Sequence, residues 1–113
     1  MNIQIFGRSK CFETKKAQRY FKERNIKFQF VDLDRWGMSR KELESVCACV
    51  GADGLISQSS PLYESFNFPY ITRSVVDKID ILLENPKLIS SPVVRNGKAA
   101  TAGYKPEVWK DLQ

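Results

Sequence analysis

Apolar and polar positions near the N-terminus predict a strand followed by a helix. Residues 3–6 form a short, mostly apolar run typical of a buried strand, and glycine and serine interrupt it directly afterwards. Tyr20 and Phe21 follow Ala17 at distances of three and four residues, which is the spacing of one helix face. Cys11 is therefore expected in the loop between this strand and this helix, at or next to the helix N-terminus.

The next segment completes a β-α-β unit. The helix is predicted to end near Arg24, with Asn25 as its C-cap. Residues 26–33 alternate apolar with charged or polar residues and then become apolar, which indicates a second strand. About 12 residues of helix between two strands predict a right-handed crossover that leaves the strands parallel.

A loop and a capped helix are predicted next. Residues 34–38 are interpreted as a connecting loop. Ser39 and Glu42 have the spacing of a capping box, which predicts a helix over about residues 40–50. The apolar positions of this helix are spaced by three, four and seven residues, so they should face the core: Leu43, Val46, Cys47 and Val50.

The following region is predicted to contain loops and one further helix. Residues 51–61 are rich in glycine and serine and are interpreted as a loop, and the aromatic stretch 63–70 as irregular structure or a short helix. Thr72 is the expected cap of a helix that continues to about Leu83 and stops at residues 85–86, an Asn-Pro pair. Its predicted buried face consists of Val75, Val76, Ile79, Leu82 and Leu83.

A hairpin is predicted near the C-terminus. Residues 93–95 and 99–102 flank Asn96-Gly97, the strongest short hairpin pattern. Two antiparallel strands added to the parallel pair would complete a mixed four-stranded sheet. The predicted fold class is therefore α/β, and residues 1–113 are expected to form one small domain.

The composition restricts the expected cellular location of the protein and the kinds of catalytic and metal site it can contain. No apolar run approaches the roughly 18 residues that a membrane span needs, and no signal peptide precedes the first strand, so we expect a cytoplasmic protein without membrane contact. Its three cysteines should then be reduced. The sequence contains no histidine, which excludes Cys-His and Ser-His-Asp catalysis, and we expect no metal site.

The net charge of +5 favours anionic partners, or simply reflects a mildly basic surface. Nucleic acid is a poorly supported partner. No basic run exceeds two adjacent residues, and no recognisable nucleic-acid-binding motif is present.

Cys11 is the candidate nucleophile. A helix N-terminus presents unpaired N–H groups and a partial positive charge, which favour a thiolate and can lower a cysteine pKa from about 8.5 to roughly 3.5–7.5. Four cations lie within five residues of Cys11 and also favour the thiolate: Arg8, Lys10, Lys15 and Lys16. The negative charge of Glu13 disfavours it. The alternative is a small buried cysteine of the core, which is less expected in such a basic loop.

Cys47 and Cys49 have two interpretations. Two residues apart on a helix, their side chains point about 200° from each other, so a disulfide between them is not expected. Cys49 could instead resolve an intermediate on Cys11 if the fold brings the two together. The simpler interpretation is one core cysteine and one incidental surface cysteine.

Several segments resemble the arsenate reductase (ArsC) family, which includes the Spx regulators. The resemblance rests on residues 10–21 (Lys-Cys-Phe-Glu-Thr-Lys-Lys-Ala-Gln-Arg-Tyr-Phe), 36–50, 82–89 and 103–109, the last being Gly-Tyr-Lys-Pro-Glu-Val-Trp. The Cys-x-x-x-Lys-Lys-Ala form is more similar to an uncharacterised branch than to true arsenate reductases. The family implies a thioredoxin fold with a helical insertion over about residues 39–88, and a cis-proline at Pro92 opposite the cysteine.

The resemblance also implies a function. Cys11 would attack an oxyanion or a thiol or disulfide substrate, and glutathione or glutaredoxin would act as external reductant without any bound cofactor. The anion-binding arginines of the reductases are replaced here, one approximately by Gln58 or Ser59 and another by Ser91, so arsenate reduction should be weak or absent. The substrate-binding residues carried over are Lys10, Phe12, Thr14, Lys15, Ser59, Ser91 and Pro92.

The alternative is a protein-binding module without catalysis. Spx-type proteins share this fold, bind RNA polymerase, and many use a Cys-x-x-Cys switch. Thr14 stands where the second cysteine of that switch would be, so the switch is absent. A basic surface still allows a protein partner of this kind.

Overall fold

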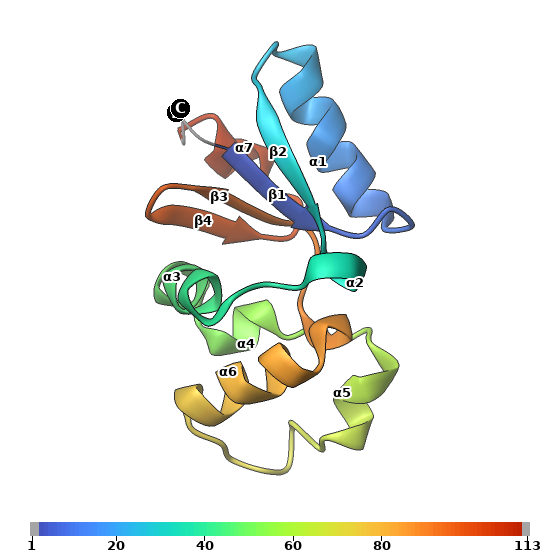
Figure 1. Cartoon of the computed structure of the whole chain (residues 1–113), viewed down its shortest axis with the longest axis vertical. Helices are drawn as coiled ribbons and strands as arrows, with labels where there is room; N and C mark the ends of the chain where they lie inside the picture. The colour runs from blue at the N-terminus through green and yellow to red at the C-terminus, as the bar shows by residue number, and fades with distance from the viewer. Residues whose placement is uncertain (1–2, 112–113) are drawn as a thin grey trace.

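The computed structural model describes residues 3–111, which form a mixed sheet covered by helices (Figure 1). The ends of the predicted domain, residues 1–2 and 112–113, lie outside the described part. Within residues 3–111 no helix is both long and apolar enough to cross a membrane. In chain order the elements are β1 (Ile3–Gly7), α1 (Phe12–Glu23), β2 (Phe28–Asp32), α2 (Leu33–Trp36), α3 (Arg40–Val50), α4 (Ala52–Leu55), α5 (Pro61–Ser65), α6 (Val75–Glu84), the 3-10 helix η1 (Pro86–Leu88), β3 (Val93–Asn96), β4 (Ala99–Ala102) and α7 (Pro106–Trp109).

The sheet has the order β2-β1-β3-β4. β1 pairs with β2 in parallel, while β3 is antiparallel to both β1 and β4. This confirms the predicted mixed four-stranded sheet and its thioredoxin-like fold class. The hairpin is also confirmed, with its turn one residue later than predicted, because Asn96 still pairs with Ala99 and Gly97 takes the positive φ of 61°.

Alternation along the strands supplies two cores, one on each face of the sheet. Ile5 and Val94 pack with α1 and α7, where Trp109 is fully buried and its indole N–H donates to the Thr101 hydroxyl at 2.7 Å. On the other face, Phe6 and its neighbours pack against the helices between β2 and β3. Those helices occupy the lower half of Figure 1, and α1 lies against the sheet in the upper half.

Two loop predictions in the middle of the chain are corrected by short helices, and the aromatic stretch 63–70 begins with a short helix, which is one of the two alternatives predicted for it. The expected connecting loop after β2 contains α2, whose first N–H groups are capped because the Asp32 carboxylate accepts from the Asp34 N–H at 3.0 Å. The glycine- and serine-rich stretch contains α4, and the aromatic stretch begins with α5. The capping box of Ser39 and Glu42 that starts α3 is confirmed.

The predicted start of α6 is wrong. Ser74, not Thr72, caps the helix, because its hydroxyl accepts from the Asp77 N–H at 3.1 Å. Val75 and Val76 are 53% and 62% exposed, so the first turn of α6 does not contribute to the buried face. Ile79 and Leu82 are buried as predicted, and Leu83 is half-buried against the same core.

Candidate functional site

Cys11 is the N-cap of α1, in the loop that follows β1, as the sequence predicts. Its backbone is extended, with φ −80° and ψ 121°, and its N–H donates to the Arg8 carbonyl at 3.0 Å to close a turn. The side chain is partly exposed. A sulfur at this position lies beside the unpaired N–H groups of the first helical turn.

A cis-proline turn faces Cys11 from the start of β3. The peptide bond between Ser91 and Pro92 is cis, as the family resemblance implies, and Pro92 is buried. The Cys11 thiol donates to the Ser91 carbonyl, with 3.9 Å between Sγ and O. Sequence segments eighty residues apart therefore meet at the sulfur.

Thr14 connects the loop that contains Cys11 to the cis-proline turn through hydrogen bonds of its side chain. It is fully buried, and its hydroxyl oxygen lies 3.1 Å from that of Ser91, with which it shares a hydrogen bond. The same oxygen accepts from the Arg8 N–H at 3.4 Å. Gly7 makes room for it, because a Cβ on Gly7 would lie 2.5 Å from the Thr14 hydroxyl oxygen.

The surroundings of Cys11 favour its thiolate. Burial raises the pKa of the Cys11 thiol, but hydrogen bonds from the side chains of Ser91 and Thr14 and from the backbone N–H groups of Thr14 and Glu13 outweigh it. The pKa therefore lies below the ordinary value for a cysteine. Hydrogen bonds to the sulfur thus supply activation of the kind that the sequence leads us to expect from the helix N-terminus and the nearby cations.

Arg8 connects the nucleophile loop to the segment that leads into the cis-proline. Its guanidinium donates from Nη1 to the Ile89 carbonyl at 2.9 Å and from Nη2 to the Pro86 carbonyl at 2.6 Å. Its Nε pairs with an Asp34 carboxylate oxygen at 3.1 Å. From the sequence, Arg8 is expected only as a positive charge near Cys11. These hydrogen bonds were not predicted, because the accepting carbonyls belong to a distant part of the chain that no local sequence pattern connects to Arg8.

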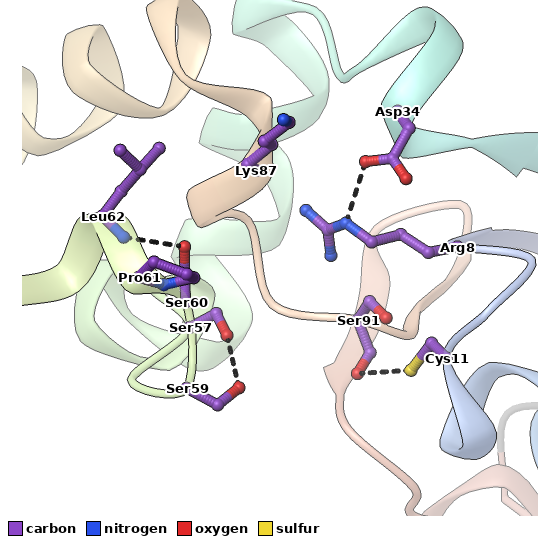
Figure 2. Close-up of a pocket in the computed structure, with 10 residues that line it drawn as sticks. All are labelled: Arg8, Cys11, Asp34, Ser57, Ser59, Ser60, Pro61, Leu62, Lys87 and Ser91. Carbon is purple, nitrogen blue, oxygen red and sulfur yellow. Dashed lines mark hydrogen bonds and ion pairs between the residues drawn. The ribbon is translucent and has the colours of Figure 1, made fainter.

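A cavity of about 710 Å³ opens in front of Cys11. Figure 2 shows Cys11, Ser91 and Arg8 on one side of it and a serine-rich loop on the other. The lining residues are Arg8, Cys11, Asp34, Ser57, Ser59, Ser60, Pro61, Leu62, Lys87 and Ser91. The facing wall therefore offers hydroxyl groups, and Lys87 adds a cation from η1.

The predicted site residues divide into three groups. Ser59 and Ser91 line the cavity with Cys11, while Thr14 and Pro92 are buried directly behind it. The remaining three are exposed and do not line this cavity: Lys10, Phe12 and Lys15. Sequence reasoning missed six further lining residues, which reach the cavity only through the tertiary fold: Asp34, Ser57, Ser60, Pro61, Leu62 and Lys87.

Cys49 is not placed to resolve an intermediate on Cys11. Its thiol donates to the Lys98 carbonyl at 2.9 Å, in the turn at the far end of the β3-β4 hairpin, whereas Cys11 contacts Ser91 before β3 begins. The four residues of β3 span about 10 Å, and a disulfide needs Cα atoms within about 7 Å. Cys47 packs partly buried against the core, as predicted.

The arrangement can carry out nucleophilic thiol chemistry on a molecule that enters the cavity. Cys11 supplies the sulfur, and Ser91 and Thr14 supply hydrogen bonds to its charged form. Within residues 3–111, no three cysteine or carboxylate side chains gather in a way that could hold a metal ion.

Comparisons with known proteins find both regulators and reductases. The chain is 26% identical over 106 residues to the global transcriptional regulator Spx 2 of Oceanobacillus iheyensis, covering 92% of this chain and 78% of that protein. It is 24% identical over 106 residues to the regulatory protein MgsR of Bacillus subtilis, covering 92% and 84%.

Among solved structures, an arsenate reductase from Vibrio cholerae superposes with a TM-score of 0.88 at 22% identity, covering 100% of this chain and 98% of that one. At this identity the likeness shows the thioredoxin-like fold alone. The model of the ArsC family matches residues 6–112, nearly the whole chain. The chain therefore belongs to the ArsC family.

Proposed function

We propose that the protein is a thiol-dependent oxidoreductase with Cys11 as its nucleophile. The Cys11 thiolate attacks one sulfur of a disulfide in the cavity, the S–S bond breaks, and the other half leaves as a thiolate with the bonding electron pair. A second thiolate, from glutathione or a glutaredoxin-like protein, then attacks the Cys11 mixed disulfide. This forms a new disulfide, reduces the Cys11 sulfur and returns it as a thiolate.

One observation carries this proposal. The Cys11 sulfur lies at a helix N-terminus, opens onto a cavity and has a pKa held below the ordinary value by named hydrogen bonds. A buried core cysteine would show neither the cavity nor the depressed pKa. The family is consistent with the proposal, because its fold includes an arsenate reductase among its solved members.

Arsenate itself is a poor substrate in this proposal. The wall that faces Cys11 carries the hydroxyl groups of Ser57, Ser59 and Ser60, which donate hydrogen bonds but hold no charge. The nearest guanidinium, that of Arg8, already donates to two carbonyls and pairs with a carboxylate. An oxyanion intermediate would lose charged hydrogen bonds worth roughly 1.5–3 kcal/mol each.

The test compares two substrates on the same protein. We expect reduction of a small disulfide with glutathione and glutaredoxin as reductants, and weak or no turnover with arsenate. Ser59→Arg should increase arsenate turnover by placing a cation on the facing wall. Ser65→Arg, at the exposed end of α5 and outside the cavity lining, is the matched control. Absence of disulfide reduction by the wild-type protein would reject the proposal.

The second candidate is a regulatory protein-binding module, which the relatives named as regulators favour. Such a module would bind a large partner of the RNA polymerase type and need no turnover at Cys11. A pull-down with Cys11→Ser separates the two functions. A binding module keeps its partner in this variant, whereas an oxidoreductase loses its activity.

A further inference from the structure

A second surface next to Cys11 lies outside the cavity and combines aromatic and basic side chains. We call Phe12, Lys16, Arg19 and Tyr104 the α1 patch. Phe12 is 70% exposed although it is a large apolar residue. The Lys16 ammonium lies 4.9 Å from the Phe12 ring centroid and 5.4 Å from that of Tyr104, so the three side chains form one continuous surface.

The charge of this surface is strongly one-sided. A hollow of about 290 Å³ between α1 and the segment before α7 is lined by three cations, Lys16, Arg19 and Arg24, and by one anion, Glu23. Exposed aromatic residues beside cations are enriched in protein interfaces, where the rings form the dry centre and the charges steer the encounter. The complementary partner is a protein surface that carries carboxylates.

The α1 patch lies next to Cys11 on a side that the cavity does not occupy. Phe12 directly follows Cys11, and Lys16 lies one helical turn further along α1. The cavity approaches the sulfur from the Ser91 side, and its lining includes no residue of the patch. A substrate in the cavity and a protein on the α1 patch can therefore approach Cys11 from separate sides.

We infer that the α1 patch docks the thiol protein that reduces Cys11, and that this protein carries acidic residues around its thiol. The inference rests on the proposed function. The docked thiolate attacks the outer sulfur of the disulfide formed between Cys11 and the substrate. The S–S bond breaks, Cys11 leaves as a thiolate, and a new disulfide joins the reductant to the substrate thiol, so the reductant sulfur is oxidised and the Cys11 sulfur is reduced.

The experiment uses defined thiol peptides as probes. Cys11 is converted to its mixed disulfide with glutathione in a Cys47→Ser/Cys49→Ser background. Return of the free Cys11 thiol, which attack on the outer sulfur produces, is followed by acid quenching and intact mass. Three peptides with one cysteine are compared, flanked by aspartates, serines or lysines, with each rate constant expressed per thiolate. At low ionic strength the acidic peptide should react about tenfold faster than the neutral one. This ratio should approach one in about 1 M salt.

Charge reversal on the patch locates the effect. Arg19→Glu and Lys16→Glu should each lower the acidic-to-neutral ratio severalfold. Lys41→Glu, an equal change of net charge at an exposed position of α3 on the other face of the sheet, should leave it unchanged. A ratio of one in the unmutated patch, or an equal loss with Lys41→Glu, would overturn the inference. Failure of the neutral peptide to return the free Cys11 thiol would instead count against the proposed function.

Discussion

The two walls of the cavity differ in how they are built. On the Cys11 wall, the Cys11 thiol donates to the Ser91 carbonyl, the Ser91 hydroxyl shares a hydrogen bond with that of Thr14, and Thr14 is fully buried. On the facing wall, Ser57 and Ser59 bond mainly to each other, with 3.1 Å between their hydroxyl oxygens, and Ser59 is exposed. One wall supplies hydrogen bonds that favour a thiolate, while the other carries mainly uncharged hydroxyl groups, with Lys87 as its cation.

This difference separates two requirements that an arsenate reductase must meet together. A nucleophilic sulfur needs hydrogen bonds to its charged form, which the Cys11 wall supplies. An oxyanion needs preorganised positive charge, which the facing wall lacks except for Lys87 at its edge. The proposed function therefore combines a thiol with a lowered pKa and a facing wall that has one cation among residues 3–111, and each prediction below tests one side of that contrast.

The largest effect is expected from removing the nucleophile. Cys11→Ser should abolish disulfide reduction, because no other cysteine lines the cavity among the described residues, and it should remove the fast alkylation of Cys11, although the exposed Cys49 can still be alkylated. Cys47→Ser and Cys49→Ser are the matched controls and should retain both activities. The readout is turnover together with the mass of the alkylated protein. Full activity in Cys11→Ser would contradict the proposed function.

A smaller effect is expected at Gly7, which supports the Cys11 wall from beneath. Gly7→Ala places a Cβ 2.5 Å from the Thr14 hydroxyl oxygen, so Thr14 must shift and overpacking should cost roughly 1–3 kcal/mol. Both the denaturant midpoint and the alkylation rate of Cys11 should fall.

Gly54→Ala is the control for this change. A Cβ at Gly54 would meet Val50 at 3.4 Å, and an alanine in α4 is favoured by helix propensity. This variant should leave Cys11 reactivity unchanged. If Gly7→Ala reacted at the wild-type rate, Thr14 would not hold the site.

The smallest change removes one hydrogen bond to the sulfur. Thr14→Val deletes a hydroxyl that favours the thiolate, so the pKa of Cys11 should rise and the alkylation rate at neutral pH should fall by up to about tenfold per pKa unit. The pH dependence of alkylation measures this directly. An unchanged midpoint would show that the hydroxyl does not act on Cys11.

Thr101→Val is the matched control, because it also replaces a buried threonine. It leaves the Trp109 indole N–H without its partner, which should cost about 1–3 kcal/mol of stability. Thr101 packs under α7, so the Cys11 titration should stay in place. Together the two variants separate an effect on the thiol from a general loss of stability.

The strands and the position of Cys11 at a helix N-terminus were predictable because local patterns encode them. Strand alternation, the capping box at Ser39 and the Asn96-Gly97 turn each depend on neighbouring residues, and the cis bond at Pro92 followed from the family resemblance. Exposure of Val75 was not predictable, because helical spacing shows that a face is apolar but not which turns find a partner.

The residues that line the cavity were predictable only in part, because several of them come together only in the tertiary fold. Cys11 and Ser91 were identified by motif, but Asp34 and Lys87 reach the cavity from helices that the sequence places far apart. The three contacts of Arg8, with two carbonyls and one carboxylate, depend on positions that only the tertiary fold defines.

The most direct test of the account is the titration of Cys11 itself. In a Cys47→Ser/Cys49→Ser background, the rate of alkylation is measured against pH, since only the thiolate reacts. The account predicts a midpoint below the ordinary cysteine value, because hydrogen bonds to the sulfur outweigh its burial and increase the thiolate fraction at neutral pH. A midpoint at or above about 8.5 would contradict it.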